Sequence, residues 1–230
     1  MKKYILGQLA LFGEAEIVGF GSVDFLVKKI PRKDANKIII NNHYSKKFYN
    51  ASTIHLGVFI KDNLVGVLQY GYAMNPASMD GVVEHTKIDE YLELNRMWFM
   101  DESPKNAKTQ ALSYSIKYIK RKYPKIKWIQ SFADERCCKF GIVYQAANFL
   151  YCGDHTSDFW EIDNIFYHNS LMTRNPNLAP SAAFVQINKD RAIKHTFRQF
   201  RYIYFIKKNT RKNLRLSILP YPKHYAKTNN

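Results

Sequence analysis

The chain has 230 residues, of which 46% are hydrophobic and 15% aromatic, so an intrinsically disordered protein is excluded and one domain is expected. Lysine and arginine number 35 against 19 aspartate and glutamate residues, which gives a formal net charge of +16. This excess predicts a polyanionic partner, although lysine-rich surfaces are also typical of proteins from AT-rich genomes.

The cysteines and the N-terminus predict an intracellular protein. An odd number of cysteines without a CxxC pair does not build a disulfide framework, which favours a reducing compartment. The first 13 residues resemble a signal peptide, but Gln8 interrupts the apolar run and acidic residues follow it, so a strand is expected there. No stretch approaches the roughly 20 apolar residues of a membrane span, and no membrane partner is expected. The three cysteines are Cys137, Cys138 and Cys152.

Hydrophobic periodicity predicts the elements of the first half of the chain. Pro31 suits the first turn of a helix. Lys61, Asp62 and Asn63 separate two apolar runs, which is typical of an antiparallel hairpin. The predicted elements are a strand at 23–30, a helix at 31–42, strands at 54–60 and 64–72, and a loop at 74–87.

The second half begins with an alternating segment at 91–100. Period-two alternation places an arginine on an otherwise apolar face, which comprises Leu92, Leu94, Arg96 and Trp98. Pro124 ends the helix that follows, and Asp163 with Asn164 is the turn of a second hairpin. The predicted elements are the strand at 91–100, a helix from 101 to about 123, a strand at 126–132, a helix at 141–148, and strands at 159–162 and 165–168.

The strand, helix and strand between residues 91 and 132 predict the fold class. Their connection is too long for a hairpin, so the two strands are parallel. The fold is therefore α/β, with a mixed, partly parallel twisted sheet flanked by helices. Ligands of such sheets bind beyond the carboxyl ends of the strands, which here are residues 99–106 and 131–134.

Two residues at this edge are candidates for chemistry, and each has a structural alternative. A buried Arg96 needs an anion, and Asp134 is the expected partner because Glu93 is expected on the opposite face. Arg96 could equally bind a substrate or a donor molecule. Asp134 could accept a hydrogen bond or a proton from an amine, or it could cap the helix that follows.

Three further features carry weaker signals. Tyr144 lies on the predicted helix at 141–148, where a tyrosine is usually part of the core. His43 follows the first helix and could be a base, a metal ligand or a complement to the helix dipole. Residues 103–109 lie where a helix begins, so their backbone N–H groups could receive an anion.

The positive charge is concentrated at the end of the chain. Residues 169–230 contain 13 basic residues and one acidic residue, interleaved with aromatic residues, whereas residues 1–168 are nearly balanced. This pattern is typical of nucleic-acid binding. We therefore expect a single domain that consists of a body, 1–168, and a basic C-terminal extension, 169–230, packed on it.

Several segments in order resemble one protein family. The order of elements resembles the GNAT acyltransferase superfamily. Five segments resemble more closely the Mom family of bacteriophage DNA-modification enzymes, over about residues 41–167 and more weakly beyond. These segments are NHYS at 42–45, LNRMW at 94–98, PKNA at 104–107, SFAD at 131–134 and YQAANFLYCG at 144–153.

The resemblance implies an enzyme that transfers a carbamoylmethyl (acetamido) group to N6 of adenine in double-stranded phage DNA. This modification protects the DNA from host restriction and takes place in the host cytoplasm. The residues implied in catalysis are Asp134, Tyr144, Arg96 and Tyr70. The resemblance places His43, Tyr44 and Thr109 in the substrate and donor pocket, and the carboxyl ends of the strands add Ser131, Lys105 and Asn106. Contacts with DNA are expected from Arg198, Arg201, Lys207, Lys208, Arg211 and Lys212.

The donor of the group is unknown from the sequence. GNAT enzymes hold the acyl-CoA pyrophosphate with a Gly-rich loop, whereas residues 103–109 read SPKNAKT without glycine, so acyl-CoA is in doubt. The resemblance also implies a possible iron, with His43 and Thr109 as the matching positions. Two alternatives stay open: a GNAT N-acetyltransferase that acts on a protein or a small amine, and a non-enzymatic nucleic-acid-binding module.

Overall fold

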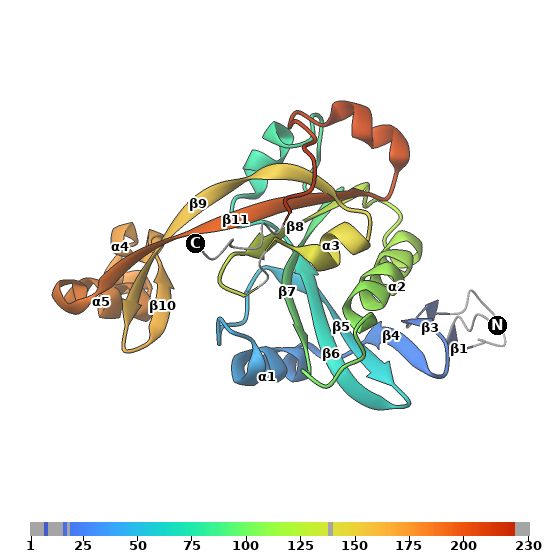
Figure 1. Ribbon diagram of the computed structural model, residues 1–230, viewed down its shortest axis with the longest axis horizontal. Coiled ribbons are helices and arrows are strands. Elements are labelled where there is room, and N and C mark those ends of the chain that lie inside the picture. The colour runs from blue at the N-terminus through green and yellow to red at the C-terminus, as the bar shows by residue number, and fades with distance from the viewer. Residues whose placement is uncertain (1–6, 9–15, 18, 138–139, 224–230) are drawn as a thin grey trace, which may run out of the picture.

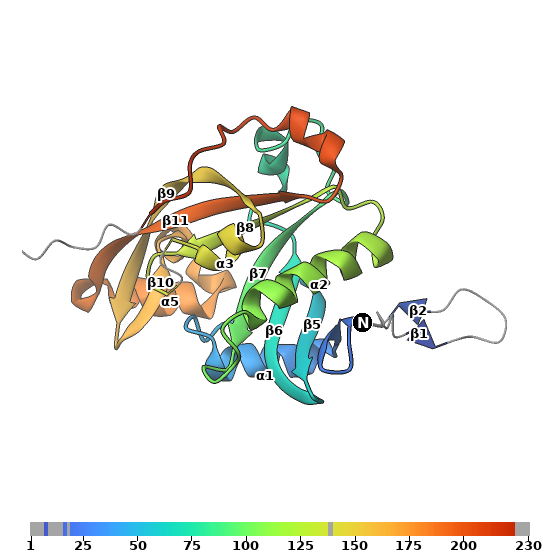
Figure 2. The same ribbon diagram turned by 45° about the vertical axis from the view of Figure 1, so that its right-hand side comes forward.

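The computed structural model describes residues 7–8, 16–17, 19–137 and 140–223. Most of them build a mixed sheet of nine strands with helices on both faces (Figures 1 and 2), as the predicted α/β class requires. The elements are β1 (Gly7–Gln8), β2 (Glu16–Ile17), β3 (Gly19–Gly21), β4 (Phe25–Lys29), α1 (Arg32–Asn42), β5 (Ser52–Ile60), β6 (Asn63–Gly71), η1 (Pro76–Gly81), β7 (Tyr91–Phe99), α2 (Ala107–Lys122), β8 (Trp128–Asp134), α3 (Ile142–Ala146), β9 (Leu150–Ile162), β10 (Ile165–His168), α4 (Ser170–Thr173), η2 (Pro176–Leu178), α5 (Pro180–Ile187), η3 (Lys189–Arg191), β11 (Ile193–Phe205) and η4 (Lys208–Asn213). The strand order is β10-β9-β11-β8-β7-β6-β5-β4-β3.

The N-terminal half follows the predicted order. α1 begins directly after Pro31, whose fixed φ suits a helix start. β5 and β6 form the predicted hairpin, and its turn residues Lys61 and Asp62 have φ values of 46° and 68°. Two consecutive positive φ angles are typical of a type I′ turn, which matches the twist of the flanking strands. Of the strand expected in the first 13 residues, only β1 lies within the described residues.

β7, α2 and β8 form the predicted parallel crossover. Tyr91 to Leu94 of β7 pair in parallel with Trp128 to Ser131 of β8. Beyond these residues β7 pairs with β6, and β8 pairs with β11. The two parallel strands therefore separate toward their carboxyl ends, and the residues beyond Leu94 and Ser131 flank this separation.

α2 begins later than predicted. Ala107 is its first residue, whereas the sequence predicted a start at residue 101. The chain before α2 makes two turns, in which the N–H of Ser103 donates to the carbonyl of Met100 and the N–H of Ala107 donates to that of Pro104. Pro104 therefore belongs to a turn and not to the first turn of the helix.

A β-bulge in β7 reverses the predicted faces of this strand. Two consecutive residues of β6 pair with Arg96 and Leu94, so Asn95 between them is an extra residue. Leu94 packs in the core beneath α2, whereas Arg96 shares the opposite face with Glu93. The extra residue shifts the period-two alternation, so the prediction of one common face is wrong for Leu92, Leu94, Arg96 and Trp98.

The C-terminal part of the chain lies inside the sheet. β11 is inserted between β8 and β9 and pairs with both in antiparallel register. Phe200, Tyr202 and Ile203 of this strand are completely buried. Residues 169–230 are thus not an extension packed on a body of 1–168, because their longest strand completes the sheet of that body.

β9 and β11 project beyond the sheet as a two-stranded ribbon. Only Gln199 to Phe205 of β11 pair with β8, and the preceding residues pair with β9 alone. β10, α4 and α5 are attached at the distal end of the ribbon, at the left of Figure 1. We call residues 155–199 the arm.

The core has two faces. α2 and α3 cover one face, where the larger hydrophobic cluster includes Leu94, Leu112, Ala133 and Tyr144. α1 covers the other face through Ala35 and Ile39. Among the helices of the described ranges, none is long and apolar enough to cross a membrane.

Candidate functional site

Asp134 ends β8 as a buried carboxylate that is 4% exposed. Arg136 donates to both of its oxygens, with Nε 2.9 Å from Oδ1 and Nη2 2.5 Å from Oδ2. The backbone N–H of Arg136 and the hydroxyl of Tyr44 also donate to this carboxylate, over 3.0 and 3.2 Å. Burial alone would raise the pKa of Asp134, but the hydrogen bonds and charge of Arg136 lower it below its ordinary value.

Arg136 is therefore the partner of Asp134, and the predicted pair between Arg96 and Asp134 is not formed. The guanidinium of Arg136 also lies among aromatic rings, most of which belong to the arm. Guanidinium groups are attracted to the faces of such rings, and they stack on them well because they are planar. The rings and their distances from the guanidinium carbon are Phe159 at 4.0 Å, Phe197 at 5.1 Å, Phe166 at 5.3 Å and Tyr44 at 5.4 Å.

His43 is buried directly after α1, and its ring packs on that of Tyr44 at 4.3 Å. The backbone N–H of Ser45 donates to Nδ1 over 3.1 Å. Nδ1 is thus an acceptor, which places the proton of the neutral ring on Nε2. Burial, and next the charge of Arg96, lower the pKa of His43 to about 3, so the ring is a neutral hydrogen-bond donor at neutral pH.

We expect His43 to reduce stability in acid. The unfolded chain binds this proton near the ordinary pKa of 6.5, whereas the folded chain binds it only near 3. The free energy of unfolding therefore keeps the full contribution of the neutral ring above pH 6.5 and loses it as the pH drops toward 3. Between pH 6.5 and 5 this loss is about 2 kcal/mol. Urea unfolding at both pH values should show a smaller loss for His43→Asn than for the wild type. A His43 ring that titrates near 6.5 by NMR would contradict the assignment.

Arg96 faces the same side of the sheet as Asp134 and His43. Its Nε donates to the carbonyl of Lys47 over 3.0 Å, and its Nη1 donates to that of Asn95 over 2.7 Å. Burial lowers the pKa of Arg96. Neutral carbonyls satisfy part of the guanidinium without neutralising it, so Arg96 remains a cationic group that can bind an anion or a carbonyl.

Glu93 joins this face because of the bulge at Asn95. The amide of Gln130 donates to its carboxylate over 2.7 Å, and that of Asn95 over 3.2 Å. Burial raises the pKa of Glu93, while the charges of Arg96 and Arg201 act in the opposite direction. The face between α1 and the arm thus contains carboxylates and guanidinium groups from three strands.

Tyr144 and Tyr70 lie on the other face of the sheet. The ring of Tyr144 packs against those of Tyr202 and Phe149 beneath α3, and 3% of the residue is exposed. Tyr70 is completely buried, and its hydroxyl lies 2.6 Å from that of Ser115 on α2. Tyr70 therefore packs as a core residue, and neither tyrosine shares a face with Asp134.

The predicted pocket residues are divided in the same way. His43 and Tyr44 lie with Asp134, whereas Ser131 shares the α2 face of β8 with Ala133. Ser131 is completely buried at the last pair of β7 and β8, and its hydroxyl has no hydrogen-bond partner in the described part of the chain. Lys105 and Asn106 are exposed before α2, and Thr109 is in its first turn.

The two positions matched to iron do not form a metal site. Nδ1 of His43 accepts the N–H of Ser45, so the proton is on Nε2 and neither nitrogen offers a free lone pair. Within residues 19–137 and 140–223 no group of three or more His, Cys, Asp and Glu could hold a metal ion. These donors do not suit iron.

The residues predicted to contact DNA fall into two groups. Arg198 forms an ion pair with Asp154, and Arg201 is half-buried over the ring of Phe132. The other four lie in or beside η4, beyond the end of β11, and are Lys207, Lys208, Arg211 and Lys212. About 20 Å of strand separates the two ends of the β8–β11 pairing, so these four residues lie far from Asp134.

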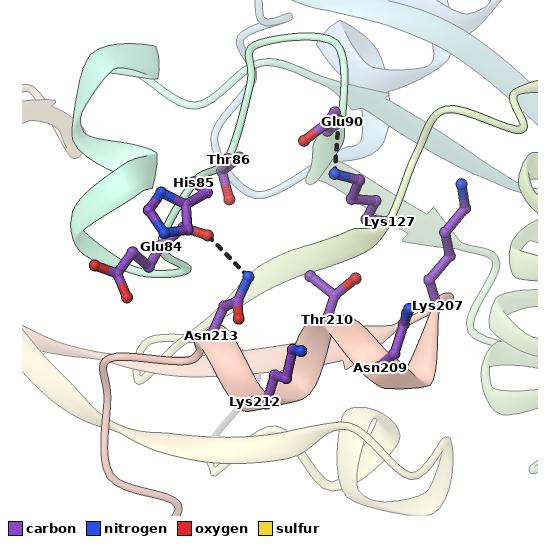
Figure 3. Close-up of a pocket in the computed structure, with 10 residues that line it drawn as sticks. All are labelled: Glu84, His85, Thr86, Glu90, Lys127, Lys207, Asn209, Thr210, Lys212 and Asn213. Atoms are coloured by element: carbon purple, nitrogen blue, oxygen red, sulfur yellow. Dashed lines mark hydrogen bonds and ion pairs between the residues drawn. The ribbon is translucent and has the colours of Figure 1, made fainter.

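A polar cavity of about 310 Å³ lies between η4 and the loop before β7 (Figure 3). Lys127 forms an ion pair with Glu90 over 2.7 Å at the side of the cavity that faces η4 (Figure 3). The amide of Asn213 donates to the carbonyl of Glu84 over 3.3 Å, which fastens η4 to the loop. The residues that line the cavity are Glu84, His85, Thr86, Glu90, Lys127, Lys207, Asn209, Thr210, Lys212 and Asn213.

Sequence reasoning missed Arg136 and Glu93 as members of the site. Arg136 is two residues beyond a strand end and directly follows Glu135, which is an ordinary pattern on a surface. Its proximity to aromatic residues of the arm depends on long-range pairing. For Glu93, the only available signal was strand alternation, and that signal is reversed by the bulge.

Comparisons with known proteins point to one family. The model of the Mom protein family matches residues 24–223. The protein named methylcarbamoylase mom of Escherichia phage Mu is 46% identical over 213 residues, which cover 91% of this chain and 88% of that protein.

Solved structures of acetyltransferases match this chain at low identity. The structure of Arabidopsis thaliana NAA60 in complex with a bisubstrate analogue has a TM-score of 0.50 at 8% identity and covers 79% of this chain and 97% of that one. An acetyltransferase of the GNAT family from Streptococcus pneumoniae has a TM-score of 0.45 at 10% identity and covers 79% and 99%. The likeness to NAA60 confirms the expected GNAT-like fold and concerns the fold alone.

Proposed function

Because the chain belongs to the Mom protein family, we propose that it transfers a carbamoylmethyl group to N6 of adenine in phage DNA. The modified DNA would resist host restriction nucleases. The observation that carries this proposal is the convergence of His43, Tyr44, Arg96 and Asp134 on one face of the sheet, where three of the five family segments meet. The substrate is double-stranded DNA, and the reaction takes place in the host cytoplasm.

The chemistry explains why a polar face is needed. The lone pair of N6 is delocalised into the adenine ring, and the amine is paired inside the duplex, so the base must be flipped out to react. N6 then forms a bond to the methylene carbon of the group while the bond to the donor breaks, and N6 loses a proton to water. Positive charge develops on N6 during this step, and an ionised carboxylate stabilises it.

Asp134 supplies that carboxylate. Its lowered pKa keeps it ionised at neutral pH, which makes it a strong electrostatic partner and a weak proton acceptor. We propose that Tyr44, 48% exposed and bonded to Asp134, contacts the flipped base. The neutral ring of His43 can donate from Nε2 to a ring nitrogen or a carbonyl.

The donor is proposed to bind on the face of α2 and α3. The N-terminal end of α2 has no acidic residue in its first turn and has Lys105 and Lys108 beside it, which suits an anionic donor. β7 and β8 stop pairing after Leu94 and Ser131. The opening between them would let a donor on the α2 face reach a base on the face of Asp134. Tyr144 would then protonate the leaving group from the donor side.

Mass spectrometry of nucleosides tests the function directly. DNA from cells that express the protein should contain a heavier deoxyadenosine, which is absent from cells with an empty vector. Unmodified nucleosides would refute the proposed transfer. A GNAT enzyme for other amines would instead consume acetyl-CoA without DNA, and a binding module would retain DNA without altering any nucleoside.

The basic residues of η4 are expected to bind phosphates of the same duplex. About 20 Å between η4 and Asp134 corresponds to about six base pairs, so one DNA molecule can reach both. Replacement by glutamine should reduce the slope of log affinity against log salt by about 3 to 4, since each phosphate contact contributes about 0.9. The four residues are Lys207, Lys208, Arg211 and Lys212.

A control with the same change in charge is available on α2. Lys117, Lys120, Arg121 and Lys122 lie in the C-terminal half of this helix, on a different element from η4. Their replacement by glutamine should leave the salt slope almost unchanged. Equal reductions in both variants would show that only the net charge matters, which contradicts a defined contact at η4.

A further inference from the structure

We propose that Arg136 is the positioning residue of the site, which orients Asp134 and joins it to the arm. This inference rests on the proposed function, because it explains how the carboxylate is held toward the reacting amine. Arg136 acts through Asp134 and is not proposed to touch the base.

The first support is the geometry of the pair. The Nε and Nη2 atoms of Arg136 contact separate oxygens of Asp134, at 2.9 and 2.5 Å, and its backbone N–H adds a third bond at 3.0 Å. The side chains of Arg136 and Asp134 are 15% and 6% exposed. A planar guanidinium that makes two parallel bonds fixes the plane of the carboxylate as well as its charge.

The second support is the environment of the guanidinium. Phe159 on β9, Phe166 on β10 and Phe197 on β11 each approach it, at 4.0 to 5.3 Å. These three residues belong to the arm, which makes no contact with β8 through strand pairing before Gln199. Arg136 thus contacts the arm, the end of β8 and the loop after α1 at the same time.

Lysine cannot replace arginine in this position. An ammonium group is a point charge that does not form two parallel bonds to one carboxylate, and it stacks poorly on aromatic rings. Arg136→Lys should therefore retain the positive charge and lose the orientation. Arg136→Gln removes both the positive charge and the two parallel hydrogen bonds.

Asp134 faces charged and polar groups from each neighbouring element. These are His43 and Tyr44 after α1, the side chain of Gln199 on β11, and Arg136 itself, while Arg96 on β7 acts on His43 from the same side of the sheet. Because His43 is neutral and Arg96 is not in contact with the carboxylate, Arg136 is the cation that compensates its burial. Without it, burial would raise the pKa of Asp134.

The test uses the full chain labelled with ¹³C in its aspartate carboxyl groups. In Arg136→Gln the Asp134 carboxyl should titrate at a higher pH than in the wild type, and the acid limb of the modification rate should move to higher pH by the same amount. The modification rate at neutral pH should fall about 100-fold, which is the usual effect when a catalytic group is displaced by about 1 Å. Arg136→Lys should recover only part of this rate.

A second measurement separates positioning from simple folding defects. Urea unfolding should occur at lower denaturant for Arg136→Gln, which leaves a buried charge unpaired, and should recover in the double variant with Asp134→Asn. The control is Arg191→Lys, because Arg191 makes the same two-pronged contact with Asp163 on the exposed end of the arm. This control should match the wild type in rate and stability.

The outcomes distinguish the two proposals. An unchanged titration of Asp134 in Arg136→Gln overturns the role of Arg136, whether or not DNA is modified. A wild-type rate for Arg136→Lys overturns it as well. If the wild-type protein leaves DNA unmodified, the proposed function fails, while the titration still decides whether Arg136 holds Asp134.

Discussion

Replacement of Asp134 by alanine is expected to lower the yield of modified adenine about 100- to 1,000-fold, the usual effect of removing one electrostatic partner of a transition state. The free energy of unfolding should also fall by about 3 to 5 kcal/mol, because the Arg136 side chain, only 15% exposed, is left without its anion. Asp134→Asn keeps the shape of the side chain and should retain more stability than activity. Nucleoside mass spectrometry and urea unfolding measure the two effects.

The matched control is Asp163→Ala. Asp163 also receives two bonds from an arginine, Arg191, but both side chains are more than half exposed, so their loss should change neither stability nor activity appreciably. A large and equal loss of stability in both variants would contradict the special environment of Asp134. Normal modification by Asp134→Ala would exclude the carboxylate from the reaction.

A chain that ends at residue 168 is expected not to fold. It lacks β11, so β8 and β9 lose their common neighbour, and three completely buried side chains are removed: Phe200, Tyr202 and Ile203. Burial of these three contributes about 5 to 9 kcal/mol, which is comparable with the whole stability of a typical domain. We expect no cooperative thermal transition by circular dichroism.

The control for this truncation is a chain that ends at Lys223, the last residue that matches the family. It should unfold cooperatively, with the same midpoint as the full chain. A cooperative transition in the chain that ends at 168 would show that the catalytic body is independent of its last strand.

Local patterns allowed the prediction of both hairpins and of the parallel crossover. Asp62, Asp163 and Asn164 have positive φ values, because the short side chains of Asp and Asn tolerate that region better than most, and Lys61 shares it in the first turn. The crossover followed from the length of the connection between 100 and 127. Each of these inferences depends on residues that are close in sequence.

The errors have long-range causes. No local signal marks Asn95 as an extra residue, since the bulge exists only relative to the pairing partner on β6. β11 reads as an isolated basic and aromatic segment until its neighbours β8 and β9 are known. The alternation on β8 separates Ser131 from Asp134, and only the packing of α3 shows that Tyr144 lies with the former.

The position of β11 also determines when the protein can become active during synthesis. β8 ends at Asp134, but the strand that covers its edge begins only at Ile193, so the ribosome must release most of the chain before the edge is paired. Contacts of such large sequence separation form late and leave a nascent sheet open to wrong partners. Asp134 meets Gln199, and Arg136 meets Phe197, only at that stage, so a nascent chain cannot modify DNA before its synthesis is nearly complete.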